Sequence, residues 1–254
     1  MFKKQALPCV FVLLEKKNYE TYLETINQIR CILHNKYNVI LTHKVLILDF
    51  ELAMQQALRQ GLLGNCEIKG CWFHFCQAIL RQVGNLNLRS DYLNNYDFRF
   101  WIKQFMALAL IPLSNLNDAI DIILKPNFDL NDKHLEFIEY FISQWCTAKQ
   151  SKQCPDIWNR HKASTRTDNA SETNHSIIKN SIPNTHPYCH QVVDFFKASD
   201  SSSCSNFLRL KNNFVSSLSR SSKKQQDFDE NIATTHEEYA AELRALEFSN
   251  YENR

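Results

Sequence analysis

The sequence predicts an α/β fold that is interrupted by a large all-helical insertion. Three short apolar runs lie in the first third of the chain and are separated by segments with helical periodicity, which is the pattern of a sheet whose strands are joined by helices. From Gln82 to His161, apolar and aromatic residues recur at helical spacing. The chain has only 4 Gly among 254 residues, too few for the many tight turns of a sheet-rich fold.

Strands are predicted where a short apolar run is bounded by polar residues. The run Val45–Leu48 is unbroken aliphatic and ends at Asp49, which suits a strand buried on both faces. We expect strands of one sheet over three segments: Cys9–Leu14, Val45–Leu48 and Ile68–Phe75.

Helices are predicted between and after these strands. Residues Asn18–Ile32 place their apolar side chains on one helical face. The next helix, Glu51–Gln60, is followed by Gly61, a residue type that often ends helices. A third helix is expected over Gln77–Val83.

The insertion and the C-terminal part are also predicted to be helical. The clearest apolar stripe consists of Phe137, Phe141 and Trp145, and it is more typical of a helical core than of a surface that stacks bases. Beyond the insertion we expect four segments in order: a loop and helix over Arg166–Ser181, a helix over His190–Lys197, a serine-rich linker over Ser199–Ser205, and a charged helix over Glu237–Leu246.

Composition narrows the functional classes. The net charge of +2 gives no whole-chain basic signature, so any nucleic-acid contact must use a local patch. The 9 Cys form no Cys-x-x-Cys pair, which favours reduced thiols over a disulfide framework. The apolar run Leu7–Leu14 lacks a cleavage site and is too short to span a membrane. We therefore expect an intracellular protein, nuclear or cytoplasmic, without a signal peptide or a transmembrane segment.

Three local features carry candidate chemistry, and their order is informative. Asp49 ends the predicted central strand within the sequence Asp49-Phe50-Glu51. Cys71 and His74 follow in the segment GCWFHFCQA, residues 70–78. Glu172 lies in the segment RTDNASETNHS, residues 166–176, after the predicted insertion.

Together these segments resemble the Mutator-like (MULE) transposases, over roughly Pro8 to Lys197. In that family an Asp followed by an aromatic residue and an acid ends a hydrophobic strand. A G-C-x-F-H-x-x-Q-A segment follows it, and an R-T-N-N-x-x-E-x-x-H-S segment returns after a helical insertion. Each motif alone is weakly specific, but three in this order are strongly specific.

The resemblance implies a ribonuclease H-like (integrase-like) core with a DDE active site. Asp49 would be the second acid and Glu172 the third, both as metal ligands for Mg²⁺ or Mn²⁺, which activate the attacking oxygen and stabilise the leaving one at a phosphodiester. The implied function is DNA transposition by cleavage and strand transfer. Implied partners are DNA and further copies of the chain or a full-length transposase, with no membrane.

The chain departs from the family pattern at its start. The family's first catalytic Asp lies on an earlier strand, and no acidic residue lies between Met1 and Val10. We therefore expect a partial core and no activity of this chain alone. The alternative function is a non-catalytic domesticated or decayed derivative that acts as a DNA- or protein-binding module.

The resulting division has four parts: 1–81 as the partial ribonuclease H-like core, 82–161 as the helical insertion, 162–198 as returning helices that complete the core, and 199–254 as a serine-rich linker and charged helical tail. Asp49 and Glu172 lie 123 positions apart in the sequence. We predict that the fold brings their carboxylates to one cleft, because two acids that share metal ions must approach closely.

The two acids also have structural interpretations. Asp49 has the position of an N-cap for the helix that follows it. Asn169 and Glu172 have the spacing of a capping box, in which the acid bonds back to the first residue. In the context of all three motifs we favour the catalytic interpretation, with Asn169 as an accessory residue.

The remaining accessory residues are Cys71, His74 and His175. Cys71 and His74 form half of a possible zinc site, but the partners would be the distant Cys146, Cys154 or His161 at spacings that fit no standard finger. We predict no zinc, and instead a buried Cys and a hydrogen-bonded His that orient the active site or the substrate. His175 shares a helical face with Glu172, where it would contact a substrate phosphate or support Glu172, a surface histidine being the alternative.

Overall fold

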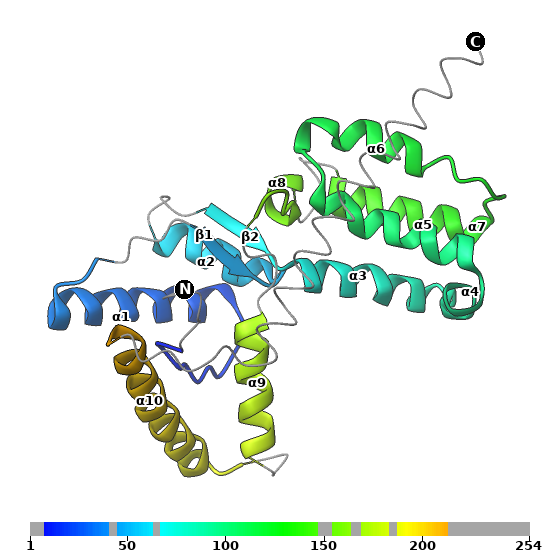
Figure 1. Cartoon of the computed structure of the whole chain (residues 1–254). Coiled ribbons are helices and arrows are strands. Elements are labelled where there is room, and N and C mark those ends of the chain that lie inside the picture. The colour runs from blue at the N-terminus through cyan, green and yellow to red at the C-terminus, as the bar shows by residue number, and fades with distance from the viewer. Residues whose placement is uncertain are drawn as a thin grey trace. The chain divides into compact units, whose positions relative to one another are not determined.

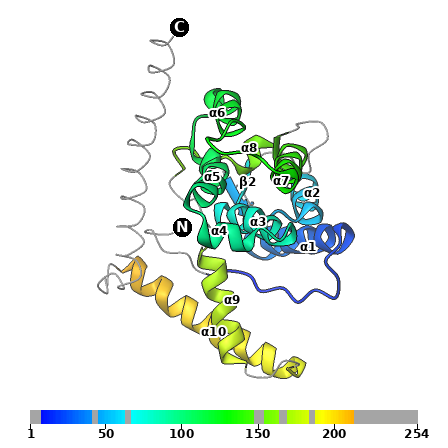
Figure 2. The same ribbon diagram turned by 90° about the vertical axis from the view of Figure 1, so that its right-hand side faces the viewer.

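The structure is a computed structural model that describes residues 8–40, 45–62, 67–146, 154–163, 169–182 and 187–212. It divides into two compact units (Figures 1 and 2). One unit is Val12–Glu172, and the other consists of Met1–Phe11 and Thr173–Arg254. Each unit is described by itself.

The described residues are mostly helical, with one small parallel sheet. In chain order the elements are α1 (Tyr19–Tyr37), β1 (Val45–Leu48), α2 (Leu52–Gly61), β2 (Glu67–Gly70), α3 (Trp72–Asn85), α4 (Arg89–Asn94), α5 (Tyr96–Ala107), η1 (Leu108–Leu110), η2 (Leu113–Asn115), α6 (Leu116–Ile123), α7 (Asp132–Phe141), the π-helix η3 (Ile142–Cys146), α8 (Pro155–Trp158), α9 (Asn169–Ser181) and α10 (Cys189–Lys211).

The sheet confirms two of the three predicted strands. β1 pairs with β2 in parallel, in a register that joins Val45 to Glu67 and Leu48 to Gly70. Helix α2 connects the two strands, as a parallel pair requires. The coarse α/β prediction therefore holds, whereas the larger sheet of a ribonuclease H-like core is not seen among the described residues.

The strand predicted over Cys9–Leu14 is wrong, because these residues form no β-ladder. Leu14 instead packs against the small core that Tyr22 and Ile26 of α1 form with Ala57 of α2. Val10 and Leu13 are 52% and 58% exposed. An apolar run becomes a strand only where a neighbouring strand accepts and donates its backbone hydrogen bonds, and here a helix pair offers an apolar surface instead.

The third predicted strand is half right. β2 ends at Gly70, and α3 begins at Trp72, so the second half of Ile68–Phe75 is helical. Phe75, Ile79 and Val83 follow at intervals of four and are at most 2% exposed. This helical spacing already begins inside the apolar run, where strand and helix patterns overlap.

Helices α1 and α2 pack at the side of the sheet. Asn18 caps α1 by accepting a hydrogen bond from the Thr21 backbone N–H at 3.0 Å. Gly61 is the last residue of α2 and not the residue beyond its end. A Cβ on Gly61 would lie 2.7 Å from Cγ2 of Ile26. Gly61 therefore permits close approach of α1, which is a different role from the helix-ending one predicted.

The main core is helical and aromatic, and the described residues of 82–161 contain no strand. Phe137, Phe141 and Trp145 are buried in it, which confirms the predicted stripe as core. The indole N–H of Trp101 donates to the carbonyl of Ile123 at 2.7 Å, so the polar edge of this buried ring is satisfied.

The unit that contains α10 differs from prediction at its serines. Residues Ser199–Ser205 continue α10 and do not form a linker. Three of their hydroxyls donate to carbonyls one turn earlier, for example Ser203 to Ser199 at 2.8 Å, so the hydroxyls bond within the helix. The predicted helix Glu237–Leu246 lies outside the described residues. None of the described helices combines the length and apolarity needed to cross a lipid bilayer.

Candidate active site at the ends of two parallel strands

Asp49 lies directly after β1, at the edge where both parallel strands end. The backbone N–H of Cys71 donates to the carbonyl of Leu48 at 2.8 Å, so the pairing extends one residue beyond Gly70. The side chains that follow β1 and β2 therefore emerge next to each other. In open parallel sheets this carboxyl edge is where ligands commonly bind.

His74 reaches Asp49 from the first turn of α3. Its Nδ1 lies 2.8 Å from Oδ1 of Asp49. The side chains are 27% and 57% exposed, respectively, so the pair faces solvent. Both residues were predicted as site residues, but their contact was not. The sequence predicted His74 within the strand Ile68–Phe75, whereas the structure places it in the first turn of α3.

Asp49 is not the N-cap of α2, so the capping interpretation of this residue is wrong. The residue at the N-cap of α2 is Glu51, and its side chain makes no cap hydrogen bond. Glu51 instead accepts a hydrogen bond from the Tyr22 hydroxyl at 2.9 Å. Burial, and then the hydrogen bond and charge of Glu51, raise the pKa of Tyr22 to about 12. The hydroxyl therefore stays protonated and joins α1 to the segment that carries Asp49.

Phe50 and Gly70 join two of the three sequence motifs. A Cβ on Gly70 would lie 2.2 Å from Cζ of Phe50, so the ring occupies the space that a side chain would need. The Phe50 ring also contacts Trp145, whose ring meets it edge-on with centroids 5.0 Å apart. The fixed position of Phe50 in turn holds its neighbour Asp49 at the strand end.

Cys71 is fully buried, as the predicted packing role requires. Burial, and then the neighbouring Cys71, raise the pKa of the Cys76 thiol to about 12. His161, one of the distant residues considered as a zinc partner, lies with its Nδ1 2.9 Å from the carbonyl of Leu110. Within the described ranges, no three His, Cys, Asp or Glu residues are grouped so that they could hold a metal ion. The prediction about zinc remains a prediction.

The last part of the helical insertion, which contains α8, returns to the sheet. Nζ of Lys69, on β2, donates to the carbonyl of Asp156 in α8 at 2.8 Å. Trp158 stacks on Phe75 with centroids 5.0 Å apart and planes at 8°. Its indole N–H donates to the carbonyl of Trp145 at 2.8 Å. These contacts attach the returning chain to β2 and to the first helix after it.

Three successive residues then bind three successive carbonyls. The side-chain amide of Asn159 donates to Ile111 O at 2.9 Å, and the backbone N–H of Arg160 donates to Ala109 O at 2.6 Å. The His161 ring contacts the carbonyl between these two. We call residues 158–161 the return segment. Sequence reasoning missed it, because hydrogen bonds to backbone carbonyls leave no pattern in the sequence.

The third motif is only partly described. Its helix is confirmed, since α9 begins at Asn169 and extends to Ser181. The side chains of Asn169, Glu172 and His175 lie outside the described residues. The predicted approach of Asp49 and Glu172, and the capping-box alternative, therefore stay predictions.

The Asp49 carboxylate fits a divalent metal ion in its chemistry. It is a hard oxygen donor, more than half exposed, and only Oδ1 is engaged by His74. One carboxylate does not hold such an ion firmly, because Mg²⁺ sites in proteins use one or two carboxylates together with waters and substrate phosphates. The DDE interpretation expects further acids in this set, with Glu172 as one of them.

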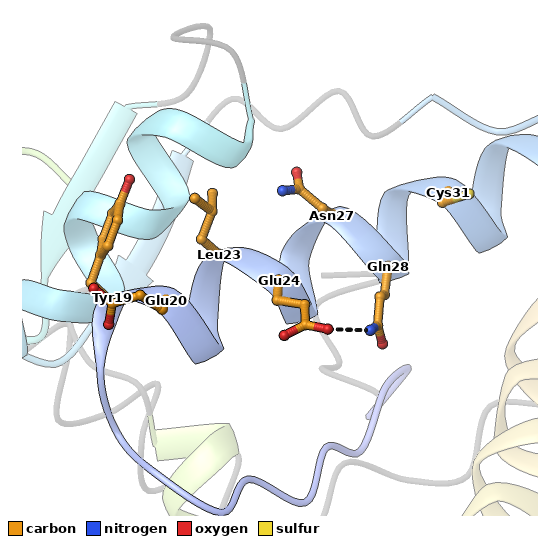
Figure 3. A pocket seen from close by; sticks show the side chains of 7 residues that line it. All are labelled: Tyr19, Glu20, Leu23, Glu24, Asn27, Gln28 and Cys31. Atoms are coloured by element: carbon orange, nitrogen blue, oxygen red, sulfur yellow. Dashed lines mark hydrogen bonds between the residues drawn. The ribbon is translucent and has the colours of Figure 1, made fainter.

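An open hollow lies elsewhere, along one side of α1 (Figure 3). Within it, Glu24 accepts a hydrogen bond from the side-chain amide of Gln28 at 3.1 Å. Its carboxylates, Glu20 and Glu24, make it unsuited to a phosphate backbone. The hollow does not include Asp49 or His74, so it is separate from the candidate site.

The candidate site is therefore defined by an acid that follows a parallel strand and by a histidine in the first turn of α3. Residues 2–78 match the family described as the MULE transposase domain. This match agrees with the resemblance to the MULE transposases over the part of the chain that it covers. The match includes Asp49, Cys71 and His74, and it ends before Glu172. No curated protein and no solved structure shows significant similarity to the chain.

Proposed function

We propose that the protein acts in DNA transposition of the MULE type, through metal-dependent phosphodiester cleavage and strand transfer. Asp49 and Glu172 are two acids of its DDE site and hold Mg²⁺ or Mn²⁺. The observation that carries the proposal is the position of Asp49, at the shared end of two parallel strands, with Nδ1 of His74 2.8 Å from one carboxylate oxygen. The match over residues 2–78 supports the same conclusion.

The proposal includes a ribonuclease H-like core. A strand that ends in an acid, a helix and a parallel neighbour are the parts of such a core that the described residues contain. The contact of α8 with β2 supports the inclusion of Glu172, because Lys69 donates to the carbonyl of Asp156 shortly before α9 in the sequence. DNA and further transposase copies are the proposed partners, and the nucleus is the proposed place of action.

Metal binding tests the site directly. Titration of the full chain with Mn²⁺ in the presence of DNA, followed by electron paramagnetic resonance, measures affinity. We expect Asp49→Asn and Glu172→Gln each to weaken Mn²⁺ binding at least ~10-fold, because each removes a charged ligand. The control variants are Asp121→Asn and Glu136→Gln, which remove exposed acids on α6 and α7. Unchanged affinity in either site variant would remove that residue from the metal site.

A cleavage assay separates the transposase from its alternative. DNA strand cleavage in Mn²⁺ that disappears in both Asp49→Asn and Glu172→Gln supports an enzyme. DNA binding that survives in both variants, without cleavage by any form of the chain, supports the non-catalytic binding module.

A further inference from the structure

Helix α5 has an outer face that combines exposed rings with positive charge. Tyr96 is 68% exposed and Phe100 is 36% exposed, although the opposite face of the helix is buried in the main core. Arg99 and Lys103 lie on the same outer face, because residues at intervals of three, four and seven coincide on a helix. We call these four residues the α5 platform.

The two rings already form the start of a stack. Their centroids are 6.2 Å apart, and their planes are inclined by only 15°. The Arg99 guanidinium lies over the Tyr96 ring, 5.9 Å from its centre. Its Nη1 donates to the carbonyl of Leu93 at 3.0 Å, so the cation is held in place by the preceding helix. The rings are thus ordered before any ligand arrives.

The charge of the α5 platform selects the kind of ligand. Arg99 and Lys103 are both cationic, and the platform itself contains no acid. The nearest acid in the helix is the exposed Asp97, which lies about 100° around the axis from Tyr96. A flat ligand with a negative backbone matches this arrangement, because its rings can pack on the exposed Tyr96 ring and its phosphates can contact the cations. A protein partner would not need the nearly parallel, stacked rings.

We propose that the α5 platform binds unpaired bases of DNA, with a base packing against the exposed Tyr96 ring, which Phe100 supports, and a backbone phosphate contacting Lys103. The choice of DNA as the ligand rests on the proposed function. The platform itself is independent of the metal site, because none of its residues contacts Asp49 or His74 among the described interactions.

The test is fluorescence anisotropy with a labelled 20-nucleotide single strand of thymidines, performed in EDTA. We expect Tyr96→Ala and Phe100→Ala each to weaken binding ~10-fold, the loss typical for one stacked base. Tyr96→Phe retains the ring and should bind within about twofold of wild type. Lys103→Ala should lower the dependence of log K on log salt concentration by about 0.7.

The chain provides a matched control at Tyr37. This ring is 57% exposed and has Lys36 over it at 5.2 Å, but it lacks a second stacked ring. Tyr37→Ala should leave single-strand binding unchanged. Three results would overturn the proposal. Wild type does not bind the strand, Tyr37→Ala weakens binding as much as Tyr96→Ala, or Tyr96→Ala binds normally and changes only the sedimentation coefficient of the protein. The assay contains EDTA and therefore measures single-strand binding without the metal site, so failure of this proposal and failure of the metal site remain distinguishable.

Discussion

At the scale of single residues, Gly70 and Phe50 hold the candidate site together. The ring of Phe50 lies where a Gly70 side chain would be, and the same ring packs edge-on against Trp145. Gly70 could be recognised in the sequence as part of a motif. The physical reason for a glycine at this position could not be recognised, because it depends on the ring of Phe50, twenty positions earlier in the sequence.

Gly70→Ala should destabilise the protein by about 1–3 kcal/mol, the usual cost of forcing extra volume into a packed site. Urea unfolding followed by circular dichroism measures this loss. The matched control is Gly84→Ala in α3, where a Cβ meets no atom within 4 Å. That change should stabilise by roughly 0.5–1 kcal/mol, because alanine favours a helix over glycine. Phe50→Leu combined with Gly70→Ala should recover part of the loss, and no recovery would contradict the assigned clash.

His74 shows what residue-level reasoning could and could not supply. The motif predicted that it lies near the active site, but the apolar run Ile68–Phe75 predicted it in a strand and not in the first turn of α3, where it lies. The contact with Asp49 required knowledge that β1 and β2 are adjacent and parallel. The α/β pattern predicts that the two strands are neighbours in a sheet. It does not predict their register.

At the scale of elements, α7 begins with a capping box that depends on a neutral histidine. The His134 backbone N–H donates to the Asn131 side chain, and the Asn131 backbone N–H donates to Nδ1 of His134 at 3.3 Å. The ring is buried against Phe98, with centroids 4.9 Å apart. Burial lowers the pKa of His134 from its usual 6.5, and the charge of Asp91 opposes this shift.

The protein should lose stability as the pH falls below about 6.5. The unfolded chain takes up a proton on His134 there, whereas the folded chain does not until its lower pKa, so acid favours unfolding. Thermal melting at pH 7.5 and pH 5.0 measures the difference. His134→Gln keeps a capping-box side chain without titrating, and it should reduce the fall in Tm. His34→Gln, at an exposed site on α1, should leave the fall unchanged, and equal effects of the two variants would exclude His134 as the cause.

The apolar segments show why some elements were predictable and others were not. Val45–Leu48 is a strand, as its unbroken aliphatic run predicts, but Val45 is 46% exposed and the strand is only partly buried, so the expected burial on both faces is wrong. Cys9–Leu14 has an equally apolar pattern but no partner strand among the described residues. Local composition shows that a segment is apolar. Its tertiary contacts then determine whether it forms a strand or a loop.

At the scale of the whole molecule, the unit Val12–Glu172 includes both the sheet and the helical region. The sequence predicted these as separate parts, 1–81 and 82–161, because periodicity changes between them. The return segment links them, since Trp158 contacts Phe75 at the start of α3 and Trp145 at the end of the helical stretch. Such long-range contacts have no counterpart in local sequence patterns.

Trp158→Phe should weaken the sheet and the helical region together. The phenyl ring can still stack on Phe75, but the buried carbonyl of Trp145 loses its donor, at a cost of about 1–3 kcal/mol. Native-state hydrogen exchange measures this at two amides: Cys71, bonded to Leu48 at the sheet, and Leu124, bonded to Ile120 at the end of α6. Both should lose equal protection if the two regions open as one cooperative unit.

The matched control for this prediction is an apolar truncation outside the return segment. Leu135 on α7 is 52% exposed, so Leu135→Ala should change neither amide by more than about 0.5 kcal/mol. Loss of protection at Leu124 alone after Trp158→Phe would show that the sheet opens independently of the helices. The return segment would then not be the link that couples the end of β1, with Asp49, to the chain that continues toward Glu172.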